Sequence, residues 1–89
     1  MNYDKINPSI DLHGEYSFSA EILTKEFIND NIKLKNKKLC IIHGIGNGVL
    51  KNTVHNLLKN DKRIKSYKVD FMNPGCTIVE IKEDLWVNY

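Results

Sequence analysis

Two short motifs join a histidine to a glycine at the end of an apolar segment. Asp11 and His13 stand two positions apart just before Gly14, and His43 follows the apolar run 39–42. Residues two apart in an extended strand point to the same face, so Asp11 and His13 lie side by side. An imidazole exchanges a proton near neutral pH, and a neighbouring carboxylate can orient it. The pattern therefore indicates acid-base chemistry, with Asp11, His13 and His43 as candidate catalytic residues.

The second motif continues into a loop with glycine at alternate positions, at Gly44, Gly46 and Gly48. An apolar-periodic segment begins at Val49, which predicts a strand, a tight loop and a helix in that order. Glycine lets a ligand approach the main chain, and a helix N-terminus offers unpaired N–H groups and a positive dipole end. This arrangement suits an anion such as phosphate, but taken alone it fits a plain strand-to-helix turn equally well, and it is His43 beside the loop that points to a functional site. The predicted phosphate or nucleic-acid ligands are Gly14, Gly44, Gly46, Asn47, Gly48 and Lys51.

The hydrophobic pattern predicts the strands and helices that position these residues. Alternation and helical spacing predict a strand from residue 9, a helix over 17–34, a strand over 38–43, a helix over 49–60 and strands over 67–71 and 76–81. Asn73, Pro74 and Gly75 are typical of a turn between the last two strands. This order is a right-handed crossover unit followed by a hairpin. If the first two strands are parallel neighbours, His13 and His43 meet at one sheet edge, where α/β folds bind ligands.

Composition limits the class of protein. The 89 residues, 42% hydrophobic and 27% charged, predict one soluble domain, and the net charge of +2 alone is too small to indicate a polyanion partner. The lysine-rich turn 33–38 is expected to be a solvated connection. No apolar leader or membrane-length run occurs, so we expect a cytoplasmic protein. Cys40 and Cys76 lie in or beside apolar runs and are expected to be buried, reduced thiols. His55 is expected to be a surface residue.

We divide the chain into an N-terminal extension (1–8), one domain (9–82) and an apolar C-terminal tail (83–89). The tail contains Leu85, Trp86, Val87 and Tyr89. It is expected either to pack back on the domain or to contact a second copy, which would give a monomer or a weak homodimer.

The two motifs in this order resemble the Smr domain, the small MutS-related module found alone and at the C-terminus of some MutS-type proteins. The resemblance extends from Ile10 to Ile81 and includes the segments 11–14, 42–50 and 77–81. It implies a compact two-layer βαβαββ sandwich with a mixed four-stranded sheet. It also implies nucleic-acid binding, with endonuclease activity on DNA or RNA. Ile45 stands where the family often has a basic residue, and Asn47 where it often has threonine.

The preferred hypothesis is phosphodiester cleavage, with the glycine loop holding the phosphate. One of His13 and His43 would act as the general base and the other as the general acid, and Asp11 would orient an imidazole. A neighbouring 2′-hydroxyl of RNA would attack without a metal or other cofactor. In a variant mechanism, Asp11, His13 and His43 bind a divalent cation, Mg²⁺ or Mn²⁺, that activates water.

Two other classes of function use the same residues. The first is a non-catalytic nucleic-acid-binding module, in which the loop grips backbone phosphates with help from Lys51, Lys59, Arg63 and the lysine-rich turn 33–38. The second is a phosphohydrolase that acts on small molecules. No membrane partner is expected in any of these alternatives.

Overall fold

The computed structural model describes residues 7–86 of the 89 in the chain. Its elements follow the predicted order of strands and helices and end in a short 3₁₀-helix. They are β1 (Ser9–Asp11), α1 (Ser17–Lys33), β2 (Lys38–Ile42), α2 (Val49–Lys59), β3 (Ile64–Asp70), β4 (Asn73–Ile81) and η1 (Glu83–Trp86).

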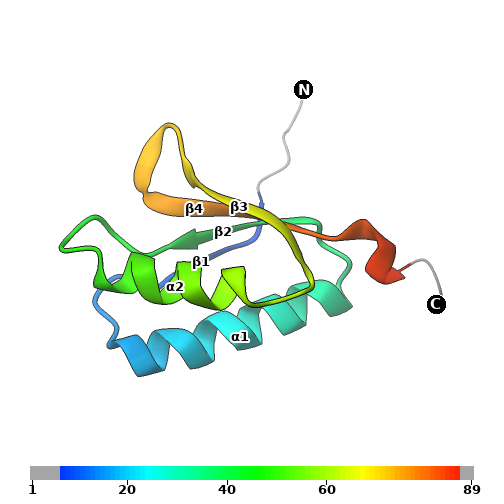
Figure 1. The fold of residues 1–89 in the computed structure, drawn as a ribbon, viewed down its shortest axis with the longest axis horizontal. Coiled ribbons are helices and arrows are strands. Elements are labelled where there is room, and N and C mark those ends of the chain that lie inside the picture. Colours follow the sequence, from blue (N-terminus) through cyan, green and yellow to red (C-terminus); the bar gives the residue numbers. More distant parts are fainter. Residues whose placement is uncertain (1–6, 87–89) are drawn as a thin grey trace.

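The four strands form one mixed sheet in the order β1-β2-β4-β3. β1 runs parallel to β2, with Asp11 opposite Ile42, and β4 is antiparallel to both of its neighbours, β2 and β3. Figure 1 shows α1 and α2 side by side beneath one face of this sheet. The two-layer βαβαββ architecture that the sequence predicts is therefore confirmed.

The core lies between the sheet and the two helices. Alternate residues of the central strands face the helices, so Leu39 and Ile41 of β2 are fully buried. Positions four or eight residues apart lie on one face of a helix, so α1 buries Ala20 with Ile28 and α2 buries Val54 with Leu58. Burial of apolar surface at about 25 cal/mol per Å² holds the two layers together. This rigid frame fixes the sheet edge at which β1 and β2 end.

The turn between β3 and β4 differs from the prediction. Asn73, Pro74 and Gly75 belong to β4, and the chain reverses at Phe71 and Met72 instead. The Asp70 carboxylate accepts a hydrogen bond from the Met72 N–H at 3.0 Å, which makes this turn. Pro74 is tolerated because the register of β3 and β4 shifts between Val69 and Asp70, leaving a ladder irregularity. β3 also begins earlier than predicted, at Ile64.

The two cysteines lie on adjacent strands and are joined by a disulfide. Cys40 of β2 and Cys76 of β4 are bonded to each other, with their Cα atoms 6.5 Å apart. The prediction that both are reduced thiols is therefore wrong for this structure. It failed because the pairing of β2 with β4 brings together cysteines that are 36 residues apart in the sequence.

The C-terminal tail starts by packing back on the domain. Leu85 of η1 contacts the core cluster, and Glu83 pairs with Lys37 at 2.8 Å. Val87 and Tyr89, like residues 1–6 of the N-terminal extension, lie outside the described residues. The weak homodimer through the tail stays a prediction. Within residues 7–86, none of the helices has the length and apolar character that a membrane span requires.

Candidate functional site

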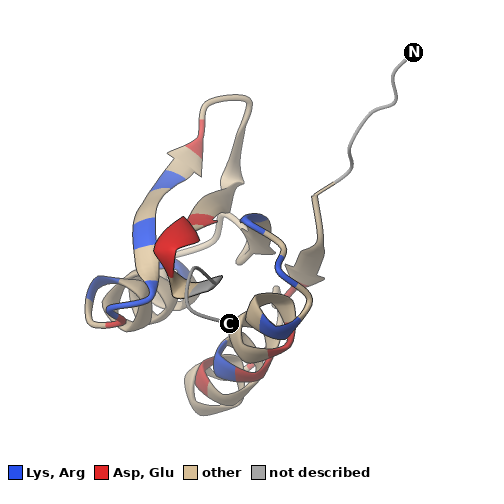
Figure 2. Cartoon of the chain, turned by 90° about the vertical axis from the view of Figure 1, so that its right-hand side faces the viewer, with Lys and Arg blue, Asp and Glu red and all other residues tan. Residues whose placement is uncertain are grey.

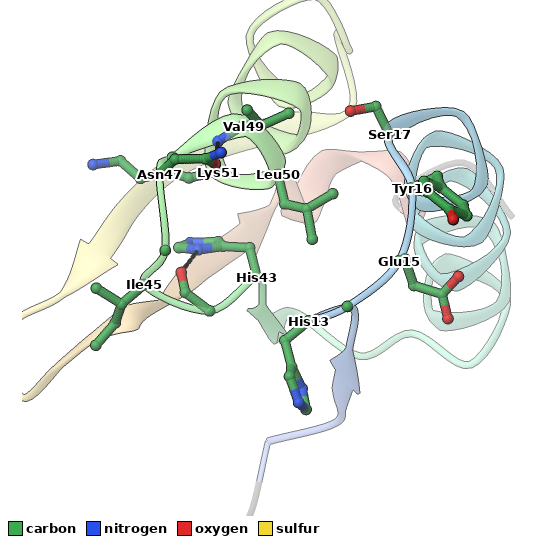
Figure 3. Close-up of a pocket in the computed structure, with 14 residues that line it drawn as sticks. His13, Glu15, Tyr16, Ser17, His43, Ile45, Asn47, Val49, Leu50 and Lys51 are labelled. Atoms are coloured by element: carbon green, nitrogen blue, oxygen red, sulfur yellow. Dashed lines mark hydrogen bonds between the residues drawn. The ribbon is translucent and has the colours of Figure 1, made fainter.

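The two histidine motifs meet at one edge of the sheet, as the parallel pairing of β1 and β2 requires. The Leu12 N–H donates to the Ile42 carbonyl at 2.6 Å, so His13 and His43 follow neighbouring positions on the two strands. Both histidines line a surface pocket of about 510 Å³ (Figure 3). The pocket is bounded by the segment that leads into α1 and by the glycine loop that leads into α2, and its lining residues are 13–17 and 43–51.

Asp11 and His13 form an exposed pair at the rim of this pocket. The Asp11 carboxylate lies 2.7 Å from His13 Nδ1 and also accepts the His13 backbone N–H at 3.1 Å. The side chains are 54% and 72% exposed, respectively. Hydrogen bonding to Asp11 raises the pKa of His13 above its usual value, and the same bond lowers the pKa of Asp11. Because Nδ1 faces Asp11 and the side chain is largely exposed, Nε2 is the ring nitrogen turned toward solvent.

His43 has a different environment, although it borders the same pocket. Its exposed fraction is only 4%, and both ring nitrogens have partners within the protein. Nδ1 lies 2.9 Å from the Gly44 carbonyl oxygen and Nε2 lies 2.8 Å from the Thr77 hydroxyl. A carbonyl only accepts, so Nδ1 carries a proton and donates it to Gly44. Figure 3 shows the His43 ring turned into the glycine loop and the His13 ring pointing away from it.

The sequence analysis missed His55, which belongs to this buried network. Its Nε2 lies 2.8 Å from the Thr77 hydroxyl, and its ring packs edge-on against Tyr67 at a centroid distance of 5.0 Å. The Thr77 hydroxyl can donate to Nε2 of one histidine, His43 or His55, while it accepts from Nε2 of the other. Burial, followed by the nearby His43 and Lys51, lowers the pKa of His55. The only sequence signal was its position at the boundary of the apolar stripe of α2.

Gly44 is held between the ends of β1 and β4. Its φ is +82°, and a Cβ atom added there would lie 3.2 Å from the Cβ of His13. The backbone N–H groups of His43 and Gly44 both donate to the Gly75 carbonyl, at 2.9 and 3.0 Å. Only glycine combines this backbone conformation with so close an approach. Gly44 therefore couples the position of His13 to that of the glycine loop.

Both helices begin at this pocket, which makes it attractive to an anion. Gly48 is the N-cap of α2, with φ of +86°, and Tyr16 is the N-cap of α1. Neither helix has an acidic residue in its first turn, and the Asn47 side chain accepts only the Val49 N–H. The first turns keep N–H groups without intrahelical acceptors, and the positive ends of both dipoles point the same way. Lys51 adds a full positive charge to the lining.

Most of the other basic residues lie elsewhere. The lysines at 35, 37 and 38 precede or begin β2, and the glycine loop follows the other end of that strand. In Figure 1 the connection between α1 and β2 lies at the right-hand end of the molecule and the loop between β2 and α2 at the left-hand end, and Figure 2 faces the right-hand end, where blue basic segments lie. Arg63 pairs with Asp61 at 2.8 Å and also donates to Asn29. The structure therefore brings Lys51 to the site and leaves the lysine-rich turn and Arg63 away from it.

The predicted three-ligand metal set is not assembled. Asp11 and His13 are engaged with each other, and both His43 nitrogens have partners inside the protein. Within residues 7–86, no group of three or more histidine, cysteine, aspartate or glutamate side chains is arranged to hold a metal ion. The donor set of Asp11, His13 and His43 therefore does not fit a shared cation.

Known proteins that are similar in sequence match most of this chain. An endonuclease MutS2 of Clostridium kluyveri is 33% identical over 85 residues, which cover 92% of this chain and 11% of that protein. One of Caldicellulosiruptor bescii is 32% identical over 81 residues, which cover 88% of this chain and 10% of that protein. The chain thus spans about a tenth of the length of these relatives.

Two solved structures share the architecture. The Smr domain of Thermus thermophilus MutS2 superposes with a TM-score of 0.82 at 24% identity, covering 84% of this chain and 98% of that one. YdaL, a stand-alone small MutS-related protein from Escherichia coli, gives 0.79 at 17% identity, covering 83% of this chain and 63% of that one. The Smr domain model matches residues 10–82, which include both histidine motifs and every strand and helix of the sandwich except the first residue of β1. The chain therefore belongs to the Smr domain family.

Proposed function

We propose that this chain binds nucleic acid through its backbone phosphates and cleaves phosphodiester bonds, with the Asp11–His13 pair as the catalytic base. The observation that carries this proposal is the position of that exposed pair at the rim of a pocket on which two helix N-termini converge. An imidazole beside a phosphate site is suited to phosphoryl chemistry. The relatives named endonuclease MutS2 support the same reaction class.

In this mechanism the glycine loop and the start of α2 hold a phosphate, and their N–H groups stabilise the charge that develops on its oxygens. His13 Nδ1–H donates to Asp11, which leaves the Nε2 lone pair to accept a proton from the attacking hydroxyl. The nucleophile is the neighbouring 2′-hydroxyl on RNA, or water on DNA. As its oxygen bonds to phosphorus, the bond from phosphorus to the leaving oxygen breaks, and the leaving oxygen takes a proton from solvent water. The imidazolium that forms remains paired with the Asp11 carboxylate, which stabilises it.

His43 takes a positioning role in this proposal. Its two nitrogens bond to Gly44 and Thr77, so proton transfer to a substrate would require that network to break. We therefore replace the acid and base pair expected from the sequence by one catalytic dyad, Asp11 and His13. His43 holds the Gly44 peptide so that the loop keeps its shape.

The test is a cleavage assay on end-labelled RNA and DNA, each as a single strand and as a structured hairpin. We expect His13→Ala to lower the cleavage rate by about 10²- to 10⁴-fold, the usual contribution of a general base, while binding is retained. Lys38→Ala, at the far end of β2, is the control and should cleave like wild type. Cleavage by His13→Ala at the wild-type rate would refute the catalytic assignment. A chelator arm tests whether a divalent cation takes part.

A second candidate function is a binding module without chemistry. It is favoured by Ile45, an exposed apolar residue on the pocket lining where a cation would assist phosphate binding. If wild type binds the oligonucleotides and cleaves none of them, this second function replaces the first. Competition by mononucleotides distinguishes both from an enzyme acting on small phosphorylated molecules.

A further inference from the structure

Tyr16 and Phe18 form an exposed aromatic pair at the start of α1. They are 76% and 68% exposed, and their rings stack nearly parallel, with centroids 6.4 Å apart and planes 9° from each other. The core of the domain does not use them, because α1 buries the face that carries Ala20, Thr24 and Ile28. Two large, nearly parallel rings that are exposed to water leave ring faces available to a third flat group.

The pair adjoins the pocket that contains the glycine loop. Tyr16 lines this pocket, and Figure 3 shows it on the α1 side, across the opening from Ile45 and Asn47. A ligand that occupies the glycine loop therefore extends toward the Tyr16 ring. Tyr16 at the start of α1 and the glycine loop at the start of α2 therefore belong to one surface.

Charge divides the pocket into two halves. The α2 side carries Lys51 and the glycine loop, whereas the α1 side carries the Glu15 carboxylate beside the aromatic pair. Glu15 repels a phosphate from the α1 side, and Lys51 attracts one to the other. The α1 half is thus suited to an uncharged flat group that is attached to a phosphate, and a nucleotide has this structure.

We propose that Tyr16 and Phe18 are a stacking platform for an unpaired base of a nucleic-acid strand whose phosphate lies at the glycine loop. This inference rests on the proposed function and specifies its substrate class. A base inside a duplex has both faces covered by its neighbours, so only a single-stranded or flipped-out base can stack here. Stacking accepts any base, so the platform selects unpaired strands without reading their sequence.

The test measures the binding of a fluorescent single-stranded oligonucleotide by anisotropy, beside a matched duplex. Stacking one base on an aromatic side chain typically contributes about 1–3 kcal/mol. We therefore expect Tyr16→Ala or Phe18→Ala to weaken single-strand binding by roughly 5- to 150-fold. Tyr16→Phe should bind like wild type because it keeps the ring. The control is Leu34→Ala, an exposed apolar residue at the other end of α1, and it should have no effect.

The second probe is the same strand with abasic sites, which keeps every phosphate and removes the bases. We expect wild type to bind this strand about as weakly as Tyr16→Ala binds the intact one, and Tyr16→Ala should weaken its binding no further. Equal affinity of wild type for the intact and abasic strands overturns the platform. An equal loss of duplex and single-strand binding in Tyr16→Ala overturns it as well.

Two other results distinguish a failure of the stacking platform from a failure of the proposed function. If wild type binds none of the oligonucleotides, the proposed function itself fails. If wild type binds them and Tyr16→Ala binds equally well, only the platform fails. A dimer that sedimentation detects in wild type and not in Tyr16→Ala would assign the aromatic pair to contact between copies, and would also overturn the proposal.

Discussion

At the scale of single residues, His13 and His43 border one pocket but lie in different environments, and this contrast is the basis of the different roles that we propose for them. His13 is exposed and pairs with one carboxylate, so its second nitrogen is free to meet a ligand. His43 is buried and donates to the Gly44 carbonyl, so it shapes the main chain. The residue type was visible in the sequence. The difference in role depends on which nitrogen has which neighbour, and folding decides this.

The first prediction concerns the proton affinity of His13. Its hydrogen bond to Asp11 raises the pKa above the ordinary value of 6.5, so the neutral base forms at a higher pH than for a free histidine. Cleavage should therefore rise with pH through a limb that lies above 6.5. Asp11→Asn removes the negative charge, and we expect it to lower the pKa of His13 and to move this limb to lower pH.

NMR titration of the His13 ring in wild type and Asp11→Asn measures this pKa without any activity. The control is the Asp61→Asn variant, because Asp61 pairs with Arg63 away from the pocket and should leave the His13 titration unchanged. An equal pKa of His13 in wild type and Asp11→Asn would show that the pair does not persist in solution.

The second prediction concerns Gly44, and Gly14 provides its control. Both have φ near +85°, at +82° and +87°, but an added Cβ meets His13 at 3.2 Å only at Gly44 and meets nothing within 4 Å at Gly14. Each alanine substitution should cost about 1–3 kcal/mol of unfolding free energy from backbone strain. Gly44→Ala should cost more because of the added contact, as urea unfolding would measure. Equal losses would mean that the chain relaxes to admit the methyl group.

At the scale of elements, the Thr77 hydroxyl links three parts of the fold. It joins His43, directly after β2, to His55 of α2, and Thr77 itself lies on β4. The network therefore fixes the glycine loop relative to the helix that follows it. Removing one partner of a buried hydrogen bond leaves the other polar group unsatisfied, which lowers the free energy of unfolding.

The third prediction tests this link with two substitutions of similar size. Thr77→Val keeps the shape and removes the hydroxyl, which leaves a nitrogen of His43 and one of His55 without a partner. We expect it to lower the unfolding free energy by about 1–3 kcal/mol. Thr77→Ser keeps the hydroxyl and removes one methyl group, at a cost of about 1 kcal/mol. If urea unfolding shows no loss for Thr77→Val and a loss for Thr77→Ser, Thr77 serves packing alone.

The order of elements could be read from the sequence because its signals are local. Short stretches of sequence contain the alternation of Leu39 with Ile41 and the helical spacing of Ala20 with Ile28. All the predicted strands and helices are present in the structure. The Pro74-Gly75 pair misled the turn prediction, since Asp70 makes the actual turn three residues earlier. His55 was missed because its partner Thr77 is 22 residues away, and no local pattern records such a contact.

At the scale of the whole molecule, the positive charge is distributed unevenly. A second hollow of about 670 Å³ lies near the start of β2 and is lined by Lys35, Lys37, Lys38 and Lys65, with Glu80 and Glu83 among them. The pocket at the glycine loop has one lysine, Lys51. The amino-acid composition gives only the net charge of +2. It does not say how the charge is distributed between the glycine-loop end and the lysine-rich end of the molecule. Under the proposed function, this division of charge determines which lysines lie close to the bound phosphate.

The last prediction uses salt to locate the bound phosphates. Neutralising one phosphate of a single strand makes the logarithm of the binding constant fall with the logarithm of salt concentration with a slope of about −0.7. Lys51→Met keeps the length of the side chain and removes its charge, so we expect it to reduce that slope by about 0.7. Lys38→Met removes an identical charge from the far end of β2 and should leave the slope unchanged, because that end does not contact the strand. Titrations of both variants at several salt concentrations measure the slopes. A larger change for Lys38→Met would place the bound strand on the lysine-rich end and away from the glycine loop.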